Sequence, residues 1–280
     1  MAVIFFECII AAYPTEISMI TTYHRPKTLD EALTLLTRPD TFPLGGGTLL
    51  SRPTAESVEV VDLQSLGLDI VKKSGNNLEI GATVTLQSLL ESEHTPEAMK
   101  SALKLEAPLN IRNSATVAGT LVACDGRSTF AVTLLALDAK VDIKEFEHRD
   151  LKDQSLRKAP NLQARISNLG DFLPLRPRGL ITAITIPLNV KLAFDYVSRT
   201  PADKPIVCAA LAQWNSERTR LALGGYGKSP MLAMDGTEAE GLQTAARNAF
   251  HEATDEYASA EYRMDVASTL AKRCNEKLAG

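Results

Sequence analysis

The sequence predicts an α+β protein made of two or three sub-domains that share interfaces. Its 280 residues are many for one compact core and few for several independent domains. Helix-like and strand-like stretches are mixed along the chain up to about residue 189. From Val190 onward hairpin-like strands come first and helices follow, which indicates a separate α+β lobe.

The composition excludes several classes of protein. Hydrophobic residues make up 45% and charged residues 23% of the chain, as in a soluble globular protein. The net charge of −4 comes from interspersed acidic and basic residues, whereas a nucleic-acid-binding protein needs a concentrated basic face. Aromatic residues are 5% of the chain, too few to favour a stacking platform for bases.

The cysteines and histidines are too dispersed to predict a metal site or an iron–sulfur cluster in this chain. The cysteines form no C-x-x-C pair and lie at Cys8, Cys124, Cys208 and Cys274. Scattered thiols in a chain without an export signal predict a reduced, cytoplasmic protein.

Residues 1–18 are expected to form an N-terminal extension with little role in the fold. Val3–Tyr13 is largely apolar but contains Glu7, is too short to cross a bilayer and lacks the basic start of a secretory signal. We therefore predict no membrane span.

A helix, a glycine loop and a strand are then expected in this order. Thr28 and Glu31 form a capping box for a helix that reaches Leu36. The glycine loop follows Pro39-Asp40, and the strand is Val58–Asp62. This order is the reverse of the strand, glycine loop and helix of the dinucleotide-binding fingerprint, and no Gly-Lys-Ser/Thr of a P-loop is present.

The elements expected next are mostly short. The strands expected are Leu78–Ala82, Lys140–Ile143 and Leu180–Pro187, and the helices are Thr85–Ser92, one opening at Thr95-Pro96, and Phe130–Leu137. Ala107–Ser128 is rich in small residues and shows no obvious helix, so its backbone itself is available as a binding surface. Residues 146–170 are polar and are expected to form a solvated excursion.

The C-terminal lobe is expected to contain a small sheet and two helices. Its strands are predicted at Leu192–Val197, Pro205–Trp214 and Arg218–Leu223, and its helices at Leu242–Phe250 and from about Ser259 onward. The last helix is expected to place Tyr262, Val266 and Leu270 on a single face.

Gly45-Gly46-Gly47-Thr48 is the stretch with the clearest chemical potential. Glycine tolerates positive φ and has no Cβ, so the backbone can approach a ligand closely. Successive N–H groups in such a turn can converge on an anion. A glycine-rich turn without a ligand remains the alternative at this point.

Taken in order, several motifs resemble the FAD-binding medium subunits of molybdenum hydroxylases. This is the family of carbon monoxide dehydrogenase, xanthine dehydrogenase and the aldehyde and nicotine oxidases, and the resemblance runs over nearly all of residues 19–280. The motifs are TLDEALTLL, GGGTLL, LEIGATVTLQSLLES, IRNSATVAGT, ITAITIP and SAEYRMDVASTLAKR.

The resemblance implies a fold, an activity and partners. Two α+β FAD-binding sub-domains of the vanillyl-alcohol-oxidase type would span 19–75 and 76–189, and an α+β medium-chain domain would span 190–280. The chain would be an oxidoreductase subunit that passes electrons from [2Fe–2S] clusters in a small partner subunit through FAD to an acceptor. Substrate would react on a large molybdopterin subunit, so no catalytic acid or nucleophile is assigned to this chain.

The resemblance also implies the cofactor-binding residues. They are Gly45, Gly46, Gly47, Thr48 and Leu49 in the first phosphate loop, Thr116, Val117, Ala118, Gly119 and Thr120 in the second, and Thr129 and Ile181. The family pattern of the second loop is Thr-Ile-Gly-Gly-Asn, so Ala118 and Thr120 depart from it. Leu49 and Thr129 stand where the family has aspartates, and the second of these aspartates helps to hold the nucleotide part of FAD.

Two alternatives remain beside the flavoprotein subunit. One is a degenerate subunit that keeps the fold and no longer binds FAD. The other is a stand-alone flavoenzyme, which often anchors flavin covalently through His or Cys; Cys124 is the only thiol near either loop. The family also places the loop with Arg199, Asp203 and Lys204 near the flavin ring, and a plain surface turn is the competing interpretation there.

Overall fold

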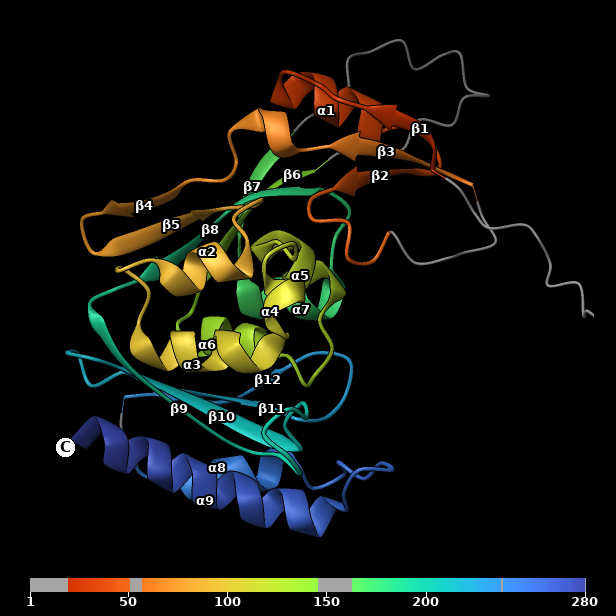
Figure 1. The fold of residues 1–280 in the computed structure, drawn as a ribbon. Coiled ribbons are helices and arrows are strands. Elements are labelled where there is room, and N and C mark those ends of the chain that lie inside the picture. The colour runs from red at the N-terminus through yellow and green to blue at the C-terminus, as the bar shows by residue number, and fades with distance from the viewer. Residues whose placement is uncertain (1–19, 51–56, 146–162, 238, 280) are drawn as a thin grey trace, which may run out of the picture.

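The protein is built in layers, with helices between two sheets. The computed structural model describes residues 20–50, 57–145, 163–237 and 239–279, so the expected extension at 1–18 lies outside the described residues. Figure 1 shows a small sheet at one end, a larger sheet next to it, a layer of helices, a second larger sheet, and a pair of helices at the far end. The predicted α+β fold class is confirmed.

The small sheet has three parallel strands. In sheet order they are β1 (Ile20–His24), β3 (Val58–Asp62) and β2 (Thr41–Leu44). Helix α1 (Leu29–Leu36) packs on this sheet, and the Glu31 amide donates to Thr28 Oγ1 as the capping box predicts. Strand β2 was not predicted, so the glycine loop follows a strand and not a helix. Pro43 fits in β2 because an edge strand can do without one N–H group.

The second sheet has five antiparallel strands and supplies one wall of the main core. In sheet order they are β4 (Val71–Ser74), β5 (Asn77–Gly81), β8 (Leu180–Pro187), β6 (Lys140–Glu145) and β7 (Gln163–Asn168). Strand β7 corrects part of the expected excursion at 146–170, because residues 163–168 pair with β6. Strand β4 forms a hairpin with β5 and belongs to the second sheet. If the two FAD-binding sub-domains are divided according to their sheets, the boundary therefore lies before Val71 and not after residue 75.

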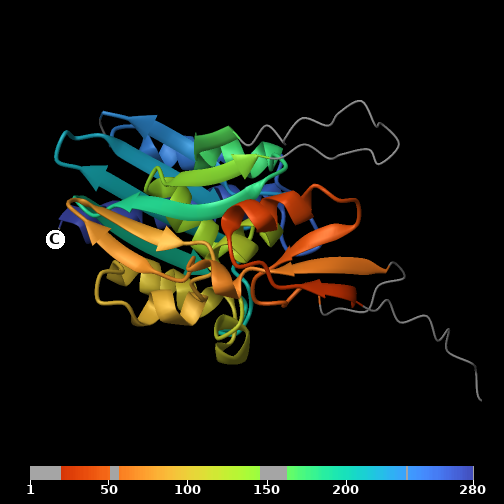
Figure 2. The ribbon, with the colours of Figure 1, turned by 90° about the horizontal axis from the view of Figure 1, so that it is seen from above.

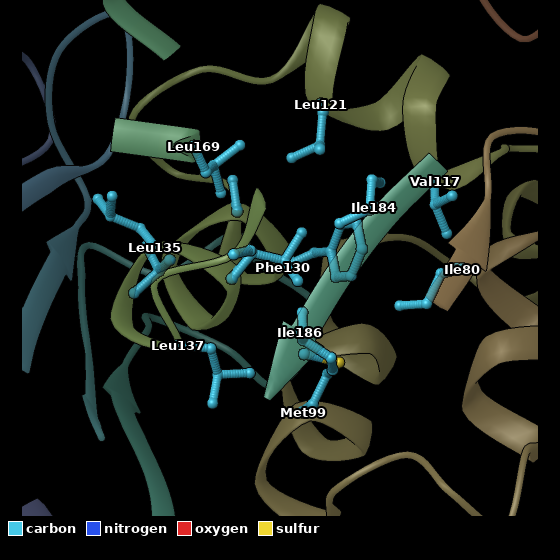
Figure 3. Close-up of a cluster of buried hydrophobic side chains, with 14 of the residues drawn as sticks. Ile80, Met99, Val117, Leu121, Phe130, Leu135, Leu137, Leu169, Ile184 and Ile186 are labelled. Carbon is cyan, nitrogen blue, oxygen red and sulfur yellow. The ribbon is translucent and has the colours of Figure 1, made fainter. Parts of the chain in front are cut away.

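A layer of short helices lies between the two larger sheets (Figures 1 and 2). It contains α2 (Leu86–Glu91), α3 (Glu97–Glu106), α4 (Leu109–Arg112), α5 (Val117–Ala123), α6 (Thr129–Ala136) and α7 (Leu169–Leu175), and a 3₁₀ turn η1 (Gln64–Leu66) follows β3. All residues of α6 are buried, and Figure 3 shows its Phe130 among Ile184, Ile186 and Met99. This central helix therefore joins the two sheets into one core.

Helices α4 and α5 correct the expectation of no helix in Ala107–Ser128. Thr116 caps α5, since the Gly119 amide donates to Thr116 Oγ1. The residues of α5 are mostly small and apolar, so the sequence shows no amphipathic period there. The helix is stabilised by its cap and by tertiary packing, and a local sequence pattern gives no information about tertiary packing.

The C-terminal lobe is a four-stranded antiparallel meander covered by two helices. In sheet order its strands are β12 (Met231–Gly236), β11 (Thr219–Gly224), β10 (Val207–Trp214) and β9 (Val190–Val197), and its helices are α8 (Leu242–Ala249) and α9 (Ala260–Ala279). Figure 1 shows α3 and α6 on one face of this sheet and the helix pair on the other. The predicted strands and helices are present, and β12 was not predicted.

The buried face of α9 differs from the predicted one. Tyr262 is 44% exposed, whereas the neighbouring Arg263 is 0% exposed. The core face contains Ala267, Leu270 and Cys274. The prediction failed because it left a charged residue out of the buried stripe. Both Nη atoms of Arg263 donate to acceptors inside the lobe, while its buried Nε has no partner among the described residues.

Among the described residues no helix combines the length and the apolar character needed to cross a membrane.

An ion-pair cluster ties the central helix to the C-terminal lobe and predicts a pH-dependent stability. Asp235 accepts from Nε and Nη2 of Arg218, each at 2.9 Å, and also pairs with Arg220. Arg220 in turn donates to the carbonyl of Leu135 in α6. The hydrogen bonds from Arg218 hold the pKa of Asp235 below its ordinary value.

We expect Asp235→Asn to lower the free energy of unfolding at pH 7 by about 1.5–3 kcal/mol, the usual contribution of a charged hydrogen bond. A carboxyl with a depressed pKa stabilises the fold above its unfolded pKa, about 4, and loses this contribution as pH falls through the folded pKa. The gap between wild type and variant should therefore be constant from pH 7 to pH 5 and shrink below about pH 4. Urea unfolding at each pH measures it.

Glu256→Gln is the control, because Glu256 is exposed and forms no ion pair with a described residue. If the difference in the free energy of unfolding between wild type and Asp235→Asn is equally large below pH 4, the depressed pKa of Asp235 is not its cause.

Candidate functional site

The glycine loop presents a row of free backbone amides. It follows the edge strand β2 directly, and Gly47 has φ 69°, in the region that favours glycine. The amides of Gly45, Gly46, Gly47 and Thr48 donate to no other residue that the structure describes. Unpaired backbone N–H groups can donate to an anion, so this loop is suited to bind one.

The loop packs directly on the segment before helix α5. A Cβ on Gly46 would lie 1.6 Å from the carbonyl oxygen of Ser114, and one on Gly45 would lie 2.8 Å from Thr116 Oγ1. Glycine is therefore required at both positions by close approach. The two segments expected to form the site, 45–48 and 116–120, meet as the sequence resemblance implied.

Two clefts adjoin the glycine loop. The apolar cleft has a volume of about 310 Å³, and Leu63, Val122 and Leu180 contribute to its wall. The polar cleft has a volume of about 700 Å³, and Asp69 and Asn113 contribute to it. Both clefts are lined by Gly45, Gly46, Gly47, Thr83 and Thr116. A ligand that lies on the loop can therefore extend into either cleft.

Most of the predicted site residues line the apolar cleft. They are Gly45, Gly46, Gly47, Thr48, Leu49, Thr116, Ala118, Gly119 and Ile181. Thr120 lies instead in a third cleft, described below. The structure thus brings together residues from the loop after β2, from α5 and its N-cap, and from β8, which are far apart in the sequence.

The second segment differs from an open phosphate loop, because its amides are already paired. Val117 N–H donates to Val84 and Ala118 N–H to Ala82, while Gly119 N–H and Thr120 N–H donate to Thr116. Ala118 is helical and has no positive φ, so alanine is not strained there. Its methyl group lies in the wall of the apolar cleft. The anion donors are therefore those of the first loop.

Val117 and Thr129 line none of the clefts next to the glycine loop. The Val117 side chain is 0% exposed and lies in the core among the side chains drawn in Figure 3. Thr129 is 1% exposed, and its Oγ1 donates to the carbonyl of Ala102 at 2.7 Å and to Glu106 at 3.1 Å. Both residues support the fold around the site.

The third cleft, which we call the lobe cleft, has a volume of about 260 Å³. It is lined in part by Thr48, Leu49, Glu106, Gly119, Thr120, Cys124 and Lys204. It therefore shares three residues of the loop region with the apolar cleft.

Cys124 in this cleft is not set up as a nucleophile. Burial raises the pKa of its thiol to about 11, so the thiol stays protonated at neutral pH. This argues against covalent flavin attachment at Cys124.

Lys204 is the one residue of the predicted loop 199–204 that reaches the lobe cleft. Arg199 and Asp203 line a separate hollow with Arg127 and Tyr257. There the guanidinium carbon of Arg127 lies 4.2 Å from the centre of the Tyr257 ring. Lys204 lines this hollow as well as the lobe cleft, and a place for the loop near the flavin ring stays a prediction.

Sequence reasoning missed two polar residues of the clefts. Thr83 Oγ1 is buried and has no hydrogen-bond partner among the described residues. Glu106, at the C-terminal end of α3, projects its carboxylate to the lobe cleft. No local signal identifies either one, because their surroundings come from segments distant in the chain.

The chemistry of the clefts suits a long ligand with an anionic middle. Free amides and an orphaned hydroxyl fit a diphosphate and its neighbouring hydroxyl groups. The apolar wall fits a flat ring. The described residues include no group of three or more His, Cys, Asp or Glu that could hold a metal ion.

Comparison with known proteins agrees with this chemistry. Residues 16–189 match the family described as the FAD binding domain in molybdopterin dehydrogenase. The chain is 27% identical over 261 residues to the uncharacterized protein YgfM of Escherichia coli K12, covering 90% of this chain and 94% of that one. It is 26% identical over 294 residues to the glyceraldehyde dehydrogenase medium chain of Sulfolobus acidocaldarius, covering 95% of this chain and all (100%) of the other.

A solved structure shows the same fold. A chain of the reconstituted CO dehydrogenase from Oligotropha carboxidovorans superposes with a TM-score of 0.76 at 24% identity. The match covers 94% of this chain and 98% of that chain.

Proposed function

Because this chain belongs to the family of FAD-binding domains in molybdopterin dehydrogenases, we propose that it is the flavin-carrying electron-transfer subunit of a molybdenum hydroxylase. The family resemblance seen in the sequence is thereby confirmed, together with FAD as the family's cofactor and with the class of oxidoreductase components. The observation that carries the proposal for this chain is the row of free amides at Gly45–Thr48, held against residues 114–116.

The residues of the clefts have distinct tasks in this proposal. The amides of the glycine loop hold the diphosphate of FAD, and the hydroxyls of Thr48 and Thr83 add donors beside it. The apolar cleft with Ile181 receives a flat ring and keeps water from it. When bound, FAD supplies the redox chemistry, while the protein binds, orients and tunes it.

The partners are proposed from the relatives. Two relatives are named as the medium chain of a dehydrogenase, and another as a subunit of a dehydrogenase complex. We propose that a small subunit with [2Fe–2S] clusters delivers electrons to the flavin and that a large molybdopterin subunit carries the substrate site. A cytoplasmic location stays a prediction.

Measurement of flavin in the isolated complex tests this function. The chain is co-expressed with the molybdopterin and iron–sulfur subunits that we propose as its partners, and released FAD is counted per chain. We expect a yellow complex with about one FAD per chain and flavin that is reduced when substrate is added.

A folded, colourless complex that takes up no added FAD would contradict the proposal. It would support the degenerate subunit that keeps only the fold and the partner surfaces.

A further inference from the structure

Glu106 is a carboxylate that the fold brings to the edge of the cofactor clefts. It is the last residue of α3 and lines the lobe cleft together with Thr48, Leu49 and Gly119. One other charged residue, Lys204, is among the residues that line this cleft. Glu106 is thus a carboxylate facing the space next to the glycine loop.

The two oxygens of Glu106 have different surroundings. Oε2 accepts from Ser128 Oγ at 2.9 Å, from Thr129 Oγ1 at 3.1 Å and from the Phe130 amide at 2.9 Å. These bonds satisfy the start of helix α6 and fix the carboxylate in place. Oε1 accepts from no described residue. Burial raises the pKa of this carboxyl above its ordinary value, although the Phe130 amide and the Lys204 ammonium act in the opposite direction.

An acceptor left free in this way can accept a hydrogen bond from a ligand. Placing a charged oxygen away from water is costly unless a hydrogen bond compensates it. The lobe cleft shares Thr48, Leu49 and Gly119 with the apolar cleft, so a ligand whose diphosphate lies on the glycine loop lies next to it. In FAD the groups next to the diphosphate and at its ends carry O–H and N–H donors.

We propose that Glu106 is a cofactor-binding residue whose Oε1 accepts a hydrogen bond from an O–H or N–H group of FAD. This inference rests on the proposed function. It also accounts for Thr129, which stands where the family resemblance implied an aspartate. The Thr129 hydroxyl is in contact with the Glu106 carboxylate, so Glu106 supplies a carboxylate at nearly the same place from another helix.

The test is the affinity of the complete complex, stripped of flavin, for added FAD. In Glu106→Gln the side-chain oxygen can keep the three donors at the start of α6. The NH₂ group of the glutamine then takes the place of Oε1. Because NH₂ donates and cannot accept, it forms no hydrogen bond with an O–H or N–H group of the ligand. We expect the dissociation constant for FAD to rise by about 10-fold to 100-fold, the range for a lost charged hydrogen bond.

Glu97→Gln is the matched control. It makes the same change from carboxylate to amide at the other end of α3, where Glu97 is exposed and lines none of the three clefts. We expect it to bind FAD as wild type does. Equal FAD affinity in wild type and Glu106→Gln would overturn the inference and leave the proposed function standing. No FAD binding by wild type would overturn both.

Competition with the two halves of FAD identifies the donor. ADP and FMN are each titrated against bound FAD in wild type and in Glu106→Gln. If the variant weakens only ADP, the donor is a hydroxyl of the adenosine half. If it weakens only FMN, the donor belongs to the flavin half and the flavin midpoint potential should shift as well. Weakening of neither half, with FAD affinity unchanged, refutes the role of Glu106.

Discussion

Replacement of Gly46 by alanine is expected to abolish the retention of FAD and to destabilise the protein. The new Cβ would lie 1.6 Å from the carbonyl oxygen of Ser114. The Cβ position is fixed by the backbone of residue 46 and the oxygen belongs to the backbone of residue 114, so no rotation of a side chain can relieve the contact. The glycine loop must then separate from residues 114–116. Overpacking of this kind costs about 1–3 kcal/mol of stability. Loss of two or more amide bonds to a diphosphate should weaken FAD binding by about 100-fold or more.

The measurement is FAD per purified chain together with the urea midpoint. Gly170→Ala is the control, because its Cβ would have its nearest neighbour at 3.6 Å, an ordinary contact with the Leu135 side chain. Gly170 lies in helix α7, where alanine is also the better helix former. The control should keep its FAD and its stability. A Gly46→Ala chain that holds FAD as wild type does would show that the loop is not the binding surface.

The glycine loop was predictable because glycine is informative by itself. Three consecutive glycines between apolar runs mark a backbone that must approach something closely. What they approach, the carbonyl of Ser114, lies 68 positions on and has no counterpart in the local pattern. For the same reason the sequence assigned Val117 and Thr129 to the site by position, while their side chains turn into the core. Glu106 was overlooked because its partners come from α6.

Two of the strands that the sequence predicted combine high β propensity with length. Strands β8 and β10 are long, apolar and flanked by turn residues, so local pattern and tertiary pairing agree. Five strands were missed, and all of them lie at sheet edges: β1, β2, β4, β7 and β12. At an edge, pairing with one neighbour defines the strand more than its own residues do. Helix α5 was missed for a similar reason, since its cap and its neighbours stabilise it more than its composition does.

Arg263 is a buried charged residue that the hydrophobic pattern of α9 did not predict. Its replacement is expected to change the free energy of unfolding more than any other substitution considered. It is fully buried on the core face of α9, where an apolar side chain would be expected. Its guanidinium donates to the carbonyls of Ala253 and Ala258 and, at 2.7 Å, to Asp255. All three acceptors lie in the segment between α8 and α9. Arg263 therefore organises that connection from inside the lobe.

We expect Arg263→Met to lower the free energy of unfolding by about 3–5 kcal/mol, because removal of one partner leaves buried acceptors and a carboxylate without compensation. Methionine keeps an unbranched apolar stem, so the loss reports the charge and its hydrogen bonds more than volume. Urea unfolding followed by circular dichroism measures it.

Arg273→Met on the same helix is the matched control, because Arg273 is exposed, and a surface change of this kind is usually within about 0.5 kcal/mol. Asp255→Asn should cost less than Arg263→Met, since the two carbonyls keep their donor. In the double variant Arg263→Met with Asp255→Asn the two losses should not add, because the second change removes a carboxylate that the first has already left unpaired. An Arg263→Met chain as stable as the Arg273→Met chain would mean that solvent or a rearranged loop replaces the guanidinium, and that the connection between α8 and α9 is held by its apolar contacts alone.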